Sequence, residues 1–327
     1  MKNPFRKAGK RLGKKITDGL NPMVLPGFHG IPLVEVVSFF VRGLRQGTLS
    51  TRAMAMSFSF LLAVFPSLIF LLTLIPYIPI KNFQTDLLIF IKEFLPKSNY
   101  ETIRHTVEDV LRHQRGGLLS IGFLAALLFS TNGINAMMKN FNLTVHTMET
   151  RSPVKQRMIS VMLTLLLFVL VVTAVLLLVF SESGLQYLVK IQWLKKKSTL
   201  LLLQTGKWIV FIALFFTAFS LLYYFGPAGK RKFSFVSPGS VLATILSVII
   251  SIGFAYFVNN IVSYSKLYGS IGTLVIIMLW INFNSYILLI CFELNASIDN
   301  AATAYHKKHY RKTVRNVLKP QALTSPT

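Results

Sequence analysis

The sequence predicts an all-α, polytopic membrane protein with six transmembrane helices and further amphipathic helices at the membrane interface. Six long windows contain no Asp, Glu, Lys or Arg, and each is long enough, at 1.5 Å per residue, to cross a hydrocarbon core about 30 Å thick. Apolar residues make up 53% of the 327 residues and charged residues 14%, against roughly 25% charged in an ordinary globular domain. The windows are continuous apolar runs without alternation, which favours helices over a transmembrane barrel.

The charge-free windows give the approximate positions of the six spans. We expect them at residues 53–78, 117–138, 158–181, 207–227, 238–262 and 270–296. Together with their connections they form one membrane domain, residues 31–300. A basic segment, residues 1–30, precedes it, and a basic tail, residues 301–327, follows it.

Most of the 35 Lys and Arg residues fall on one side of this topology. They lie before the first span, at 139–157, at 230–232 and after the last span. The positive-inside rule places that side in the cytoplasm, so both termini are expected there. Lys190 and residues 195–197 run against this bias, which is stronger elsewhere. The net charge of +24 is therefore read as a topological signal, and no nucleic-acid partner is expected.

An amphipathic helix is expected before the first span. Its apolar residues recur at helical spacing on one face: Leu33, Val36, Val37, Phe40, Val41 and Leu44. Arg42, Arg45 and Arg52 follow them, which fits the cytoplasmic surface of an anionic membrane. Membrane lipids, anionic ones above all, are thus expected partners. Topogenic charge without a specific lipid site is the alternative reading.

The long connection between the first two spans, residues 81–115, is expected to form two amphipathic helices on the outer side. The helical spacing of its apolar residues breaks at Pro96, and Ser98 with Glu101 has the spacing of a helix N-cap. The segment can be a structural lid over the bundle or a binding module. The chain has one cysteine, Cys291, which excludes disulfides within the chain.

Polar side chains inside the spans are the candidates for a polar pathway or for helix contacts. These residues are Asn132, Asn135, Asn259, Asn260, Asn282, Asn284, Glu293 and Asn295. Amides avoid lipid and turn inward, where they either bond a neighbouring helix or line a wet path. Both readings stay open for each asparagine.

Glu293 closes the last charge-free window, near its cytoplasmic end. An ionisable group at that depth is a candidate proton relay, cation ligand or partner of an inward-facing base. The structural reading pairs it with Arg52 or Arg157. At the start of that window, Gly269 and Gly272 are candidates for a tight turn between the last two spans.

The sequence offers little for catalysis. The six histidines show no HExxH pattern, and no GxSxG elbow, Walker loop or GxGxxG fingerprint is present. No catalytic residue, cofactor or metal is therefore expected, and the chain is not expected to be an enzyme.

Three segments resemble one family of bacterial inner-membrane proteins, the YihY/virulence factor BrkB family. In the first span the match falls on Ala53, Ala55, Ser57, Phe58, Leu61 and Pro66. In the middle it falls on Asn140, Arg151 and Arg157. In the last third it falls on Leu222, Tyr223, Phe225, Pro227, residues 238–239, Tyr264, and residues 267–272 and 293–296.

The resemblance covers about residues 35–300. It implies a multi-pass protein of the bacterial cytoplasmic membrane that supports envelope integrity and resistance. We expect a transporter or flippase of an anionic or lipidic envelope component, whose substrate the sequence does not identify. The alternative is a non-transporting envelope scaffold or assembly factor, and a homo-oligomer stays open. Some members have been labelled ribonucleases, which none of these residues supports.

Overall fold

A computed structural model gives the structure of the chain and describes residues 27–28, 30–46, 48–77, 116–143, 151–190, 196–228, 234–260 and 264–317. Its helices are α2 (Leu33–Gln46), α3 (Leu49–Leu74), the short 3-10 helix η1 (Ile75–Tyr77), α6 (Gly116–Asn142), α7 (Pro153–Lys190), α8 (Lys196–Phe225), α9 (Pro238–Asn260) and α10 (Tyr264–Val317). Six of these, α3 and α6 to α10, are long and apolar enough to cross a membrane. The all-α, six-span prediction is confirmed. The helices expected in 81–115 lie outside the described residues.

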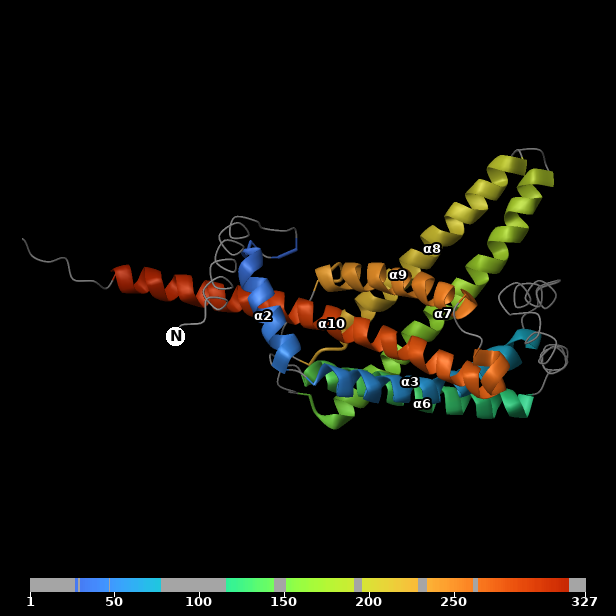
Figure 1. Cartoon of the computed structure of the whole chain (residues 1–327), viewed down its shortest axis with the longest axis horizontal. Coiled ribbons are helices and arrows are strands. Elements are labelled where there is room, and N and C mark those ends of the chain that lie inside the picture. The colour runs from blue at the N-terminus through green and yellow to red at the C-terminus, as the bar shows by residue number, and fades with distance from the viewer. Residues whose placement is uncertain are drawn as a thin grey trace, which may run out of the picture.

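The six long helices pack as a ring. Each contacts the next in chain order, from α3 through α6, α7, α8 and α9 to α10, and α10 returns to contact α3. Figure 1 shows α3 and α6 lying side by side, whereas the paired α7 and α8 extend together until their far ends stand clear of the other helices. The ring is therefore tight at one end and splayed at the other.

The main hydrophobic core lies at the tight end, where α3, α7 and α9 begin and α6 and α8 end. We call this the closed end, and its fully buried side chains include Met56, Met137, Phe141, Tyr223 and Phe292. Elsewhere the spans carry many exposed large apolar side chains, as expected for surfaces that face lipid.

Two of the spans begin with the same local signal, a serine followed by a proline. Ser152 precedes Pro153 at the start of α7, and its carbonyl accepts the first helical bond, from Gln156 N at 3.0 Å. Ser237 precedes Pro238 at the start of α9, and its carbonyl accepts from Val241 N at 3.1 Å. Serine is a favoured N-cap residue, and proline at the first helical position has no N–H to leave unpaired.

The last helix is longer than the sequence suggests. α10 runs for 54 residues without interruption, roughly 80 Å at 1.5 Å per residue. Gly269 and Gly272 lie inside its first turns, so the tight turn expected at these glycines is not there. Glycine is common in membrane helices, and neither residue is followed by a proline that would stop the helix. Beyond its apolar span, α10 continues into the basic region expected to be a tail.

The amphipathic helix expected near the N-terminus is α2, and it packs across α10. A second hydrophobic cluster joins Phe28, Ile31 and Val36 to Ile298 and Ala301 of α10. Figure 1 shows α2 crossing α10 next to the closed end. Part of the apolar face of α2 is therefore used for this contact, while Val37 and Val41 remain exposed.

Candidate functional site

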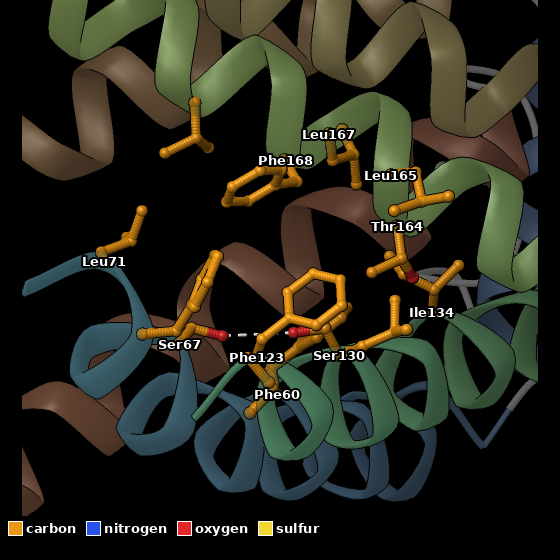
Figure 2. A pocket seen from close by; sticks show the side chains of 15 residues that line it. Phe60, Ser67, Leu71, Phe123, Ser130, Ile134, Thr164, Leu165, Leu167 and Phe168 are labelled. Atoms are coloured by element: carbon orange, nitrogen blue, oxygen red, sulfur yellow. Dashed lines mark hydrogen bonds between the residues drawn. The ribbon is translucent and has the colours of Figure 1, made fainter. Parts of the chain in front are cut away.

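A cavity of about 290 Å³ lies between α3, α6 and α7, further along α3 than the closed-end core. Its lining is mostly apolar and includes the rings of Phe60, Phe70, Phe123 and Phe168. In Figure 2, Phe123 on α6 and Phe168 on α7 point into the space from opposite sides. Ligand pockets are mostly apolar with a few polar groups, and this lining suits a hydrocarbon ligand.

Three hydroxyl side chains are the polar members of the lining that the structure describes. Ser67 of α3 and Ser130 of α6 bond each other across the helix pair, with their Oγ atoms 3.2 Å apart (Figure 2). Thr164 of α7 donates to the carbonyl of Ser160, one turn earlier, at 2.8 Å. The described lining holds no charged side chain.

A second cavity, of about 340 Å³, lies between α3 and α10. It shares Phe60, Ala63 and Ser67 with the first cavity, so the two spaces adjoin the same stretch of α3. On the α10 side it is lined by Trp280, Asn284 and Ser285 among others. The buried Oγ of Ser285 has no hydrogen-bond partner within the described part of the chain.

Three fully buried aromatic side chains fill the space between the helices at the closed end. Phe141 of α6 and Phe292 of α10 are stacked, with centroids 4.1 Å apart and ring planes 5° apart. Tyr223 of α8 lies 5.8 Å from Phe141 and donates its hydroxyl proton to the carbonyl of Leu288 at 3.0 Å. We call Phe141, Tyr223 and Phe292 the aromatic plug. On α10, Phe292 of the plug comes after Ser285, which lines the second cavity, and directly before Glu293.

Beyond the plug, two opposite charges are buried at the closed end. Arg52 in the first turn of α3 is 6% exposed, and Glu293 of α10 is 3% exposed. The two side chains attract each other electrostatically. The Arg52 guanidinium also donates through Nη2 to the carbonyl of Asn140 on α6. Of the two bases that the sequence offers to Glu293, the structure therefore brings Arg52 to it.

The helix α2 reaches this charged layer through a glycine. A Cβ at Gly43 would lie 2.7 Å from the Cδ of Glu293, closer than real Cβ contacts allow. Since only glycine leaves this space, residue 43 lets the α2 backbone lie directly on the carboxyl group. Three helices, α2, α3 and α10, thus meet at Glu293.

Asn295 ties α10 to the start of α9. Its Oδ1 accepts a hydrogen bond from Gly239 N at 2.8 Å, and its Nδ2 donates to Ser237 Oγ at 2.9 Å. Ser237 and Ser240 also exchange bonds, each backbone N–H donating to the other's Oγ at 3.1 Å. Asn295 therefore completes the N-terminal cap of α9, and its role here is a helix contact.

Side chains from other parts of the chain also hold the end of α8. Arg151 donates through Nη1 to the carbonyls of Phe225 and Gly226, each at 3.2 Å, and through Nη2 to the carbonyl of Pro227. Asn142 accepts from Ala228 N at 2.9 Å. Carbonyls at a helix C-terminus have no partner in the helix, and the guanidinium supplies donors and positive charge there.

The remaining predicted site residues lie in separate places. Asn132 accepts from Arg157 Nη1 at 2.6 Å, and Asn135 accepts from Gln156 Nε2 at 2.8 Å, both between α6 and α7. Asn284 bonds its own helix at the carbonyl of Trp280, 2.9 Å away. The Oδ1 of Asn282 is buried and has no hydrogen-bond partner among the described residues.

Asn259 and Asn260 lie in the last turn of α9, and their side chains are outside the described residues. The structure thus brings Glu293 and Asn295 to the closed end but does not gather the asparagines around one site. Among the described residues, no group of three or more His, Cys, Asp and Glu is placed to hold a metal ion.

Sequence reasoning missed the plug and Gly43. The rings of the plug come from three spans and carry no local pattern that separates them from other apolar residues. Gly43 interrupts the apolar face of α2 between Phe40 and Leu44, and that interruption was the available signal for a close helix contact.

Comparison with known proteins gives a consistent picture. The chain matches the family model described as Virulence factor BrkB over residues 40–316. It is 32% identical to a Bacillus subtilis protein named ribonuclease-like protein YfkH, over 75% of this chain and 88% of that one. It is 24% identical to a UPF0761 membrane protein of Haemophilus influenzae, over 80% of this chain and 93% of that one. No solved structure matches the chain.

Proposed function

Because the chain belongs to the virulence factor BrkB family of membrane proteins, we propose that it is a transporter or flippase in the bacterial cytoplasmic membrane. It moves an anionic or lipidic envelope component and so supports envelope integrity. The apolar cavity between α3, α6 and α7 is the observation that carries this proposal. That space takes the hydrocarbon part of the substrate.

The closed end supports a one-sided state of such a transporter. The aromatic plug and the Arg52–Glu293 layer fill the ring at one end, while the ends of α7 and α8 stand away from their neighbours at the other (Figure 1). A transporter needs a barrier on one side of its binding space at any time. A bundle packed along its whole length would instead favour the scaffold.

Two competing functions are tested alongside it. The scaffold or assembly factor is favoured by the closed end, where Asn140, Arg151 and Asn295 join helices to one another. Ribonuclease activity is suggested by the name of the Bacillus relative. Our proposal assigns this chain no catalysis, and the same purified protein tests the nuclease.

Lipid movement in liposomes tests the proposal. Purified protein is reconstituted in vesicles that contain a fluorescent phosphatidylglycerol, and an impermeant reductant reports how much of it reaches the outer leaflet. We expect transfer with the wild-type protein. Ala126→Trp fills the cavity and should abolish transfer, whereas Leu128→Trp, on the exposed side of the same helix, should retain it.

The other outcomes are equally informative. If the folded wild-type protein transfers none of the lipids offered, the scaffold function is favoured. Equal transfer by Ala126→Trp and the wild type would remove the cavity from the mechanism. RNA incubated with the same purified protein should remain intact, and cleavage that follows the protein through purification would favour the nuclease.

A further inference from the structure

A groove of about 740 Å³ runs along the outer side of the first three turns of α7. The described part of its lining comes from one face of this helix: Pro153, Val154, Arg157, Met158, Val161, Met162 and Leu165. Most of these side chains are apolar, and Val154 and Met158 are 71% and 68% exposed. Such exposure of large apolar residues in a membrane span means that they face lipid.

The groove crosses the boundary between charge and hydrocarbon. Arg157 is the last charged residue before the charge-free window that begins at Met158, and Lys155 is exposed two residues nearer the start of the helix. The guanidinium therefore lies at the level of the lipid headgroups, while Val161 and Leu165 lie deeper along the span. A molecule in this groove meets positive charge at one end and an apolar wall along the rest.

Arg157 is held in place from the neighbouring helix. Its Nη1 donates to Oδ1 of Asn132 on α6, and the atoms are 2.6 Å apart. A guanidinium has five N–H donors in a fixed plane, so this bond orients the group and leaves further donors for an acceptor outside the protein. Arginine binds phosphate well because its planar donors match the phosphate oxygens.

We propose that Arg157 and this groove form a binding site for an anionic phospholipid of the surrounding bilayer. The phosphate accepts hydrogen bonds from Arg157, and one acyl chain lies over Met158, Val161 and Met162. Asn132 acts as a positioning residue for the guanidinium. A bilayer lipid is the occupant that the groove fits, because it carries an anion at headgroup depth and a hydrocarbon chain below it.

The site is separate from the transport proposal but adjoins its cavity. Leu165 lines both the groove and the cavity between α3, α6 and α7. A lipid in the groove thus has its chain next to the space that we assign to the substrate. Binding at the groove needs no transport, and the two proposals stand or fall in different experiments.

Native mass spectrometry of the purified full-length protein measures the binding. The protein is held in a nonionic detergent, and phosphatidylglycerol or phosphatidylcholine is added in steps. We expect the wild type to retain phosphatidylglycerol in preference to phosphatidylcholine. Arg157→Gln should weaken the tightest phosphatidylglycerol binding roughly tenfold, which corresponds to about 1.4 kcal/mol.

Three matched variants make the test specific to this groove. Met162→Trp keeps the charge but fills the groove, and it should weaken phosphatidylglycerol binding as Arg157→Gln does. Asn132→Ala should weaken it less, because it frees the guanidinium without removing it. Arg42→Gln removes an exposed arginine of α2, away from the groove, and should leave the tightest site unchanged.

Each contrary result overturns the proposal. Unchanged phosphatidylglycerol binding in Arg157→Gln and Met162→Trp would place the lipid elsewhere. Equal losses in Arg157→Gln and Arg42→Gln would mean unspecific attraction to positive charge. A change in oligomeric mass in Arg157→Gln, with lipid binding intact, would make the groove an interface between copies. If Arg157→Gln or Met162→Trp lowers the melting temperature, lipid binding by the other variant decides. The two are independent tests, because the first removes charge and the second fills the groove.

Discussion

The Arg52–Glu293 pair shows how a single residue can hold several helices. Glu293 is buried, Arg52 attracts it, and Gly43 of α2 lies against its carboxyl group. Taking two charges out of water is costly, and their attraction repays that cost only when the geometry is good. Removing one partner of a buried pair is worse, because the other charge remains without compensation. Arg52 is thus placed to offset the charge of Glu293, and the ion-pair and proton-relay readings of this residue predict different results.

Replacing the carboxyl group alone should destabilise the protein. For Glu293→Gln we expect a loss of about 3 kcal/mol in the free energy of unfolding, because Arg52 keeps its charge and loses its partner. Thermal unfolding in detergent measures this. The double variant Arg52→Met with Glu293→Gln should recover part of the loss, since no buried charge is then left.

A relay would give another pattern. Glu293→Gln would then keep the wild-type melting temperature and lose lipid transfer in vesicles. A variant with normal stability and full transfer would contradict both readings of this residue.

At this scale the sequence identified Glu293 and named Arg52 as one of its two candidate partners, but it missed Gly43. A lone carboxylate at the end of a charge-free window is visible without a structure. Its contact with Gly43 is not, because glycine has no side chain that adds to the helical pattern. The asparagines were visible too, but whether an amide lines a wet path or bonds a helix depends on what faces it. Asn135 faces Gln156, and Asn295 faces the start of α9.

At the scale of elements, the start of α9 depends on its neighbour. Ser237 and Ser240 bond each other, and Asn295 of α10 accepts from Gly239 N. Gly239 allows this approach, because a Cβ there would lie 2.6 Å from the Cγ of Asn295. The sequence placed the start of this span at residue 238. The amide that completes the cap comes from a residue more than fifty positions away.

Removing this amide should weaken the contact between the last two spans. For Asn295→Ala we expect a loss of about 1–3 kcal/mol, because Gly239 N and Ser237 Oγ lose a buried partner. Asn284→Ala is the matched control on the same helix, since its Nδ2 bonds only its own turn at Trp280 among the contacts described for it. Melting temperatures in detergent compare the two. Equal shifts would contradict the capping role.

The length of α10 was predicted wrongly from the sequence. Gly269 and Gly272 were read as a turn because glycine permits one, yet glycine also continues a helix when neighbours and lipid hold it. The end of the span was likewise read as the end of the helix. Lys and Arg after residue 306 are good helix formers, and they let α10 continue beyond its apolar part.

At the scale of the whole molecule, successive helices of the ring run in alternating directions relative to the closed end. α3, α7 and α9 begin at the closed end, and α6 and α8 end there. The six spans and their order were predictable from hydropathy alone, because an apolar run of this length has no other use in lipid. The closure of the ring was not, since nothing local in α3 or α10 indicates that the first and last spans touch.

Charge asymmetry predicts that the closed end faces the cytoplasm. Single cysteines in a Cys291→Ala background test this in intact cells. Gly117→Cys, in open space at the other end of α6, should react with an impermeant maleimide. Tyr310→Cys, exposed near the end of α10, should react only after the membrane is permeabilised. The reverse labelling pattern would invert the topology.

The contact between the first and last spans has a consequence for synthesis of the protein. Arg52 enters the membrane early, whereas Glu293 is made only near the end of the chain. At about 5–20 residues per second, Arg52 waits roughly 10–50 s for its counter-charge. Arg52 lies in the first turn of α3, and an arginine near a helix end can reach the interface, so until then its guanidinium can remain hydrated at the cytoplasmic surface. A chain cut short before α10 never supplies the carboxyl group that buries this arginine, so unfinished copies differ from finished ones by an exposed guanidinium at the closed end.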